Sequence, residues 1–207
     1  GLIRRLQMRE SPNAPEVQLE GKKLLSFCSN DYLGLSNHPI LAEALAAGAV
    51  QFGIGSGASP LISGHTNAHA KLEQALAQTQ NLHIPNVSSC LMSTGFMANV
   101  GALTALASLG QISFFSDSLN HASIIDGIRF AKTCHQATVS IFQHSDYDHL
   151  KSLLELDQKA LKCIVTDGVF SMDGDIADLE KLVELKQKHN CMLFVDEAHA
   201  VGACGNN

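Results

Sequence analysis

The sequence has no CxxC pair, no long apolar run and no basic stretch longer than Arg4-Arg5. Acidic side chains outnumber basic ones, with 20 Asp and Glu against 14 Lys and Arg, which leaves a formal net charge of -6. A nucleic-acid-binding protein normally carries a basic stripe, so this composition argues against a nucleic-acid partner. A membrane-spanning helix needs about 20 consecutive apolar residues, so no membrane partner is expected either.

Cysteine spacing and the amino-terminal composition limit the compartment. The six cysteines are far apart, which excludes a disulfide scaffold and a clustered zinc site, and no metal is expected. Several of them lie inside apolar runs such as LKCIV (161–165) and CMLFV (191–195), which predicts buried thiols in a reducing compartment. The first ten residues lack the apolar segment of a secretory signal. We expect a soluble, cytoplasmic, globular chain.

From residue 40 onward, short apolar runs alternate with longer amphipathic segments. This alternation predicts βαβ units, hence an α/β fold with a mostly parallel, helix-covered sheet. The expected strands are Val87–Met92, Ile112–Ser116, Thr138–Phe142, Leu161–Thr166 and Cys191–Val195. The expected helices are Pro39–Phe52, Ala68–Thr79, Phe96–Ser108, Ala122–Ala131, Tyr147–Leu156 and Leu179–His189.

The first forty residues have a different pattern. A short basic helix is expected within residues 1–10, followed by a turn-rich stretch and a hairpin that turns at Glu20-Gly21. We therefore expect residues 1–40 to form an amino-terminal arm or a segment of a small domain. Residues 41–207 are expected to form the first part of a larger α/β domain.

Polar clusters follow the expected strands. They are STGFMAN (93–99), DSLNHASIIDG (117–127), TDGVFSMDGD (166–175) and FVDEAHAVG (194–202). Ligands of open α/β sheets bind beyond the carboxyl ends of the strands, where these clusters would meet. In the first cluster a glycine opens a helix, and backbone N–H groups there suit a phosphate. The Gly/Ser-rich stretch Gly53–Gly64 lacks the lysine of a P-loop, which argues against ATP or dinucleotide binding.

These motifs, in this order and together with FCSNDYLGLSNHP (27–39), resemble the α-oxoamine synthases. These are fold-type-I enzymes that depend on pyridoxal 5'-phosphate (PLP) and condense an amino acid with an acyl thioester. The resemblance implies an aminotransferase class I-like large domain. Its mostly parallel sheet would be of the seven-stranded type, truncated here before the carboxyl-terminal part.

The resemblance implies a role for each matched residue. Asp196 would pair with the protonated pyridine nitrogen of PLP, and His121 would stack on the ring and help to orient the substrate. Asp196 and His121 are the expected catalytic residues, and both also contact the cofactor. Ser171 and His199 would lie at the phenolic oxygen of PLP.

Three further residues have roles implied by the same resemblance. Gly95 and Phe96 would donate backbone N–H groups to the PLP phosphate. Arg4 aligns with a substrate-binding arginine, although a solvated helix face is its alternative. Asn30 lies in a segment that approaches the family's active site, with no contact assigned.

Within the family, the loop FGIGSGASPLISGHTNAHAKLE (52–73) is most similar to the biotin-pathway branch. That branch condenses L-alanine with a pimeloyl thioester (pimeloyl-CoA or pimeloyl-ACP) and releases CO₂, giving 8-amino-7-oxononanoate. A glycine C-acetyltransferase or 2-amino-3-ketobutyrate CoA ligase is the alternative. The family also implies a homodimer with active sites at the subunit interface.

One expected element is missing. The lysine that forms a Schiff base with PLP in the family follows the DEAH strand by about one βα unit, and the chain ends before it. The small carboxyl-terminal domain is also missing. We therefore expect either part of a larger enzyme or a truncated, non-catalytic binding chain.

Overall fold

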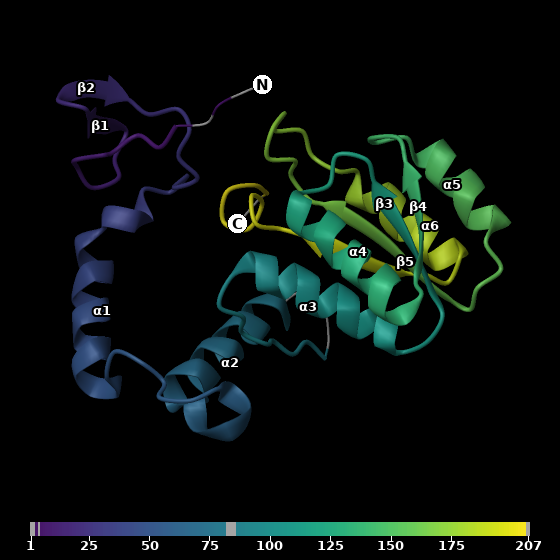
Figure 1. The fold of residues 1–207 in the computed structure, drawn as a ribbon, viewed down its shortest axis with the longest axis horizontal. Helices are drawn as coiled ribbons and strands as arrows, with labels where there is room; N and C mark the ends of the chain where they lie inside the picture. The colour runs from purple at the N-terminus through teal and green to yellow at the C-terminus, as the bar shows by residue number, and fades with distance from the viewer. Residues whose placement is uncertain (1–2, 4, 82–85, 206–207) are drawn as a thin grey trace. The chain divides into compact units, whose positions relative to one another are not determined.

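The computed structural model describes residues 3, 5–81 and 86–205, shown in Figure 1. The chain forms two compact units, Gly1–Cys90 and Leu91–Asn207. The division into residues 1–40 and 41–207 stays a prediction. Among the described residues, no helix has the length and apolar composition needed to cross a membrane.

The first unit begins with the predicted hairpin. Strand β1 (Glu16–Leu19) pairs antiparallel with β2 (Lys22–Leu25), with Leu19 opposite Lys22. The turn residues Glu20 and Gly21 have φ angles of 49° and 72°. A two-residue hairpin turn with both residues at positive φ matches the right-handed twist of the strands. The hairpin at Glu20-Gly21 is therefore confirmed.

The basic helix expected within residues 1–10 is wrong for the residues that the structure describes there, 3 and 5–10, none of which is helical. Arg9 instead forms an isolated bridge with Leu19, and the Glu10 N–H donates to the Gln18 carbonyl at 2.9 Å. Isolated helices this short are marginal in water. The segment instead makes backbone hydrogen bonds at the edge of the hairpin.

Two helices complete the regular structure of the first unit. Helix α1 spans Pro39–Phe52, as predicted, with its proline in the first turn, where a missing N–H has no cost. Helix α2 spans Asn67–Asn81 and includes the predicted Ala68–Thr79. A short π-helical turn at Pro60–Gly64 lies between them in the chain.

The second unit is built on a parallel sheet with strand order β4-β3-β5-β6. The strands are β3 (Ile112–Asp117), β4 (Thr138–Phe142), β5 (Leu161–Asp167) and β6 (Met192–Asp196). The helices are α3 (Gly95–Ser108), α4 (Ala122–His135), α5 (Tyr147–Leu156) and α6 (Leu179–Lys188). The α/β class and the parallel sheet are confirmed.

The sheet is buried on both faces, giving three layers (Figure 1). Neighbouring side chains of a strand point to opposite faces. Phe114 of β3 accordingly packs with residues of α3 and α4, whereas Phe115 packs with residues of α5 and α6, and both rings are fully buried. Burial on both sides explains why the strands read as continuous apolar runs. Cys163 and Cys191 are buried as predicted; Cys28, Cys90, Cys134 and Cys204 are exposed.

The predicted strand Val87–Met92 is wrong, because the structure gives these residues no regular secondary structure. A strand is defined by backbone hydrogen bonds to a neighbouring strand. In the described part of the chain, the parallel sheet consists of β3 to β6 only. Residues 87–92 have the composition of a strand, but the described part of the chain contains no strand that pairs with them.

Helices α3 and α4 approach each other closely at Gly127. A Cβ added there would lie 2.9 Å from Leu103 Cδ1 and 3.1 Å from the Asn99 carbonyl oxygen. Gly127→Ala should therefore lower the free energy of unfolding by about 1–3 kcal/mol through overpacking. Gly101→Ala is the matched control, because its Cβ would meet only Met92 Cε at 3.8 Å and should stabilise α3 by about 0.5–1 kcal/mol. Denaturant unfolding of the complete protein measures both; equal effects would contradict the close approach.

Candidate active site

A cavity of about 340 Å³ lies within the second unit at the carboxyl ends of β5 and β6. The starts of α3 and α4 and the segments that follow the two strands complete its wall. It is lined by Gly95, Phe96, Ala98, Asn99, His121, Ser123, Asp167, Ser171, Asp196, Ala198 and His199. The cavity thus collects all four polar clusters of the sequence at one edge of the sheet.

Six of the seven predicted site residues line this cavity: Gly95, Phe96, His121, Ser171, Asp196 and His199. Arg4, the seventh, lies outside the described residues. The structure therefore brings together the residues predicted to hold the cofactor, while the role of each stays a prediction.

The start of α3 presents free backbone donors to the cavity. Thr94 is the N-cap, and its hydroxyl accepts the N–H of Met97 at 3.1 Å. Gly95 and Phe96 are the first two residues of α3, and their N–H groups have no partner within the helix. A Cβ on Gly95 would meet nothing within 4 Å, so the space beside this donor pair is open. Such a helix start attracts an anionic group.

Asp196 ends β6, and each of its carboxylate oxygens accepts one hydrogen bond. Asn99 Nδ2 donates to Oδ2 at 2.7 Å, and the Ala198 N–H donates to Oδ1 at 2.9 Å. The buried Asn99 amide also donates to Ser123 Oγ at 2.8 Å. These contacts fix the direction of the carboxylate, because both donors belong to the surrounding elements.

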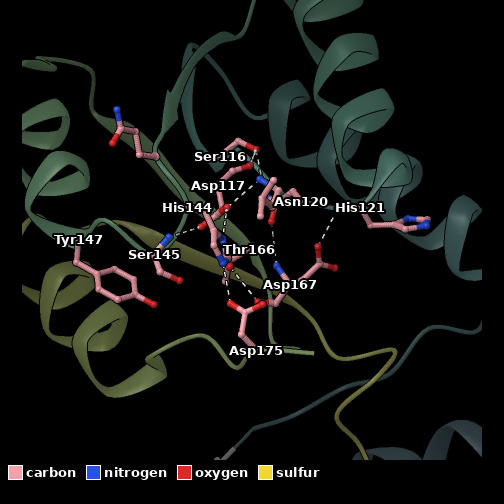
Figure 2. A network of polar contacts seen from close by, with 12 residues as sticks. Ser116, Asp117, Asn120, His121, His144, Ser145, Tyr147, Thr166, Asp167 and Asp175 are labelled. Atoms are coloured by element: carbon pink, nitrogen blue, oxygen red, sulfur yellow. Dashed lines mark hydrogen bonds and ion pairs between the residues drawn. The ribbon is translucent and has the colours of Figure 1, made fainter. Parts of the chain in front are cut away.

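His121 is the N-cap of α4, and it is held from both sides. Its Nδ1 accepts the N–H of Ser123 at 3.2 Å, and its own backbone N–H donates to Asp167 Oδ2 at 2.7 Å. Figure 2 shows the imidazole pointing away from Asp167, while the backbone of His121 faces that carboxylate. The ring is therefore exposed at the cavity wall.

Asp167 is a site residue that sequence reasoning missed. It is buried at the end of β5, directly opposite Asp196 in the parallel register. Burial raises the pKa of Asp167, the N–H of His121 lowers it in part, and the charge of Asp196 raises it again. Two carboxylates thus face one cavity, an arrangement that favours a cationic ligand group. The sequence could have indicated Asp167, because this residue directly follows the predicted strand Leu161–Thr166.

The sequence from residue 22 to 207 matches the family Aminotransferase class I and II. The chain belongs to this family. Curated relatives within it include two 8-amino-7-oxononanoate synthases. The one from Bordetella petrii is 47% identical over 206 residues, covering 100% of this chain and 51% of the relative. The one from Janthinobacterium sp. is 48% identical over 206 residues, with the same coverage.

Solved structures of serine palmitoyltransferases have the same fold as this chain. The Sphingomonas wittichii enzyme is 29% identical with a TM-score of 0.83, covering 91% of this chain and 46% of that one. A variant from S. paucimobilis with bound PLP–myriocin is 30% identical with a TM-score of 0.82, covering 91% and 47%. These relatives confirm the resemblance to α-oxoamine synthases. The chain spans about half the length of the curated relatives it matches.

Proposed function

We propose that the complete protein is a PLP-dependent acyltransferase of biotin biosynthesis. It would join the Cα of L-alanine to the acyl carbon of pimeloyl-CoA or pimeloyl-ACP, releasing CO₂ and the thiol carrier to give 8-amino-7-oxononanoate. The observation that carries this proposal is the gathering of six predicted cofactor residues around one cavity. The names of the two curated relatives support the choice of substrates.

The lining of this cavity includes groups that suit both charged ends of PLP. The N–H groups of Gly95 and Phe96 would bind the phosphate at the positive end of the α3 dipole. Asp196, held by Asn99, would accept the proton of the pyridine nitrogen. When bound, PLP supplies an electron sink for the negative charge that develops at Cα of the amino acid. A fixed carboxylate at the ring nitrogen keeps that sink cationic.

The remaining site residues would orient the ring and the substrate. His121 would cover one ring face, and Ser171 and His199 would contact the phenolic oxygen. Among the described residues, no lysine lines the cavity. We propose that the Schiff-base lysine follows residue 207, and that Arg4 contacts the substrate.

Assembly as a homodimer is part of this proposal. Large apolar side chains of the first unit are exposed, including Val50 at 90%, Ile54 at 99% and Leu61 at 97%. Exposed apolar surface becomes favourable to bury against a partner where such side chains gather. We propose that a second copy of the protein covers these side chains.

The division of the chain and its compartment are also proposals. Residues 1–40 would form an arm, and residues 41–207 would belong to the PLP-binding domain. The enzyme would be cytoplasmic.

The test is a PLP titration of the complete protein followed by substrate comparison. We expect a saturable absorbance change with PLP, and then formation of 8-amino-7-oxononanoate from pimeloyl-CoA with L-alanine but not with glycine. Preference for glycine and acetyl-CoA would instead identify a glycine C-acetyltransferase. Failure to bind PLP would identify a non-catalytic chain.

A further inference from the structure

Beside the cavity, His144 lies between two carboxylates from different parts of the chain (Figure 2). Its Nδ1 is 3.0 Å from Asp117 Oδ1, at the end of β3. Its Nε2 is 2.7 Å from Asp175 Oδ2, in the segment that follows β5. The imidazole and the ring of Phe170 are also nearly perpendicular, with their centroids 4.4 Å apart. None of these residues belongs to the cavity wall.

Each ring nitrogen of His144 faces a carboxylate oxygen, and this geometry favours the protonated form of the ring. A neutral imidazole has one N–H donor and one bare nitrogen acceptor. The bare nitrogen would face a carboxylate oxygen, which is also an acceptor. An imidazolium donates to Asp117 and Asp175 together, so the two contacts match a protonated His144 between two carboxylates.

Asp175 belongs to the loop that carries Ser171. The Phe170 N–H donates to the Asp175 carbonyl at 3.0 Å, and the Gly174 N–H donates to the Phe170 carbonyl at 2.8 Å. These two backbone hydrogen bonds close a turn that contains Ser171. An anchor on Asp175 and Phe170 therefore fixes the place of Ser171 in the cavity wall.

Asp117 contacts a second segment, residues 118–120, which leads to His121. Its Oδ1 accepts the N–H of Leu119 at 2.9 Å, and its Oδ2 accepts the N–H of Ser145 at 3.1 Å. Asp117 is buried, so its charge has little access to water and depends on these donors and on His144. Leu119, two residues before His121, is thereby tied to the same carboxylate as His144.

We propose that His144, as an imidazolium, is a positioning residue that clamps together the two loops delivering His121 and Ser171 to the cavity. The clamp itself rests on the contacts above; its consequence for PLP rests on the proposed function. Loss of the proton removes one donor, and the loop 168–177 is released from Asp117 while the sheet stays intact.

The charges around His144 set the direction of its pH response. Burial lowers the pKa of His144, but the hydrogen bonds and charges of Asp117 and Asp175 outweigh burial and raise it above 6.5. On the neighbouring helix α5, Asp146 accepts the N–H of His149, and His149 accepts the N–H of Gln143. Because the folded-state pKa is raised, the clamp is complete below about pH 6.5 and is lost as pH rises through the folded pKa.

Hydrogen–deuterium exchange of the complete, PLP-free protein between pH 6 and 9 tests the clamp. After correction for intrinsic exchange, protection of amides 169–177 should fall with rising pH in the wild type. His144→Gln should lose about tenfold or more of this protection at pH 6 and show no pH midpoint. Asp175→Asn, at a partly exposed carboxyl, removes one of the two charges that raise the pKa of His144 and should move the midpoint down by about one pH unit.

His135→Gln, at the far end of α4 from His121, is the matched control and should match the wild type. A second measurement, the PLP dissociation constant, links the clamp to the site: His144→Gln should weaken PLP binding, with the wild-type pH midpoint abolished. Wild-type protection in His144→Gln, or lost protection with unchanged PLP affinity, overturns the inference. Absence of PLP binding in the wild type refutes the proposed function instead, and the exchange data still decide whether the clamp exists.

Discussion

Asp196→Asn is expected to lower the turnover of the complete, PLP-loaded protein by about 10²–10⁴-fold, as for other groups that stabilise charge in a reaction. The substitution keeps the size of the side chain but removes the charge that would hold the proton of the pyridine nitrogen. The new amide also sets an NH₂ group toward Asn99 Nδ2 or the Ala198 N–H, both of which are donors. Rates with the proposed substrates, L-alanine and pimeloyl-CoA, measure the effect, and circular dichroism checks the fold.

Asp173→Asn is the matched control for Asp196→Asn. Asp173 is an exposed carboxylate in the same loop as Ser171, and it does not line the cavity. Its neutralisation should leave the rate within about twofold, since exposed charges interact weakly. If Asp196→Asn turned over at a rate near that of this control, the assignment of Asp196 to the ring nitrogen would be wrong.

Asn120→Ala is expected to lower the free energy of unfolding by about 2–4 kcal/mol. The buried Asn120 amide donates to Ser116 Oγ at 2.9 Å and to the Val165 carbonyl at 2.8 Å, and its Oδ1 accepts the Asp167 N–H at 3.0 Å. Alanine would leave the Val165 carbonyl and the Asp167 N–H of β5 without this partner. The neighbouring His121 would lose its fixed position, so PLP binding should weaken too.

Ser116→Ala provides the comparison for Asn120→Ala, because it removes one of the three contacts and leaves both bonds to β5. Its cost should not exceed about 1 kcal/mol. Chemical denaturation of both variants gives the two free energies. Similar values would show that the bonds to β5 are not what stabilises this edge of the sheet.

The sequence predicted the sheet strands closely because they are rich in apolar residues, and the central strands β3 and β5 are almost fully buried. β4 has the predicted bounds, whereas β3 and β5 each extend one residue further, to Asp117 and Asp167. These two aspartates still pair in register with Phe142 and Asp196. Backbone pairing is independent of side-chain polarity, so composition could not place the strand ends.

Helix α4 shows a similar limit, since it was predicted to end at Ala131 and continues to His135. The residue that ends it, Gln136, has a φ of 56°, a left-handed conformation usually taken by glycine. A glutamine at position 136 does not predict the end of a helix, so the sequence could not place this boundary.

The residues lining the cavity were predictable from motifs, but the residues that support them were not. Asn99 contacts Asp196 across 97 positions, and His144 contacts Asp175 across 31. Amide and imidazole side chains occur at many positions where they meet only water. Their partners here are determined by which strand ends become neighbours in the sheet, which requires the fold.

The capping contact of His121 determines which of its two nitrogens carries hydrogen. Since Nδ1 accepts the Ser123 N–H, that nitrogen holds a lone pair, and the neutral ring is the Nε2–H tautomer. Any hydrogen bond from this imidazole to a molecule in the cavity is then one that Nε2 donates. A substrate carboxylate or carbonyl oxygen is a matching acceptor, whereas an ammonium group is not. The first turn of a helix thereby selects the polarity of the atoms that His121 can recognise.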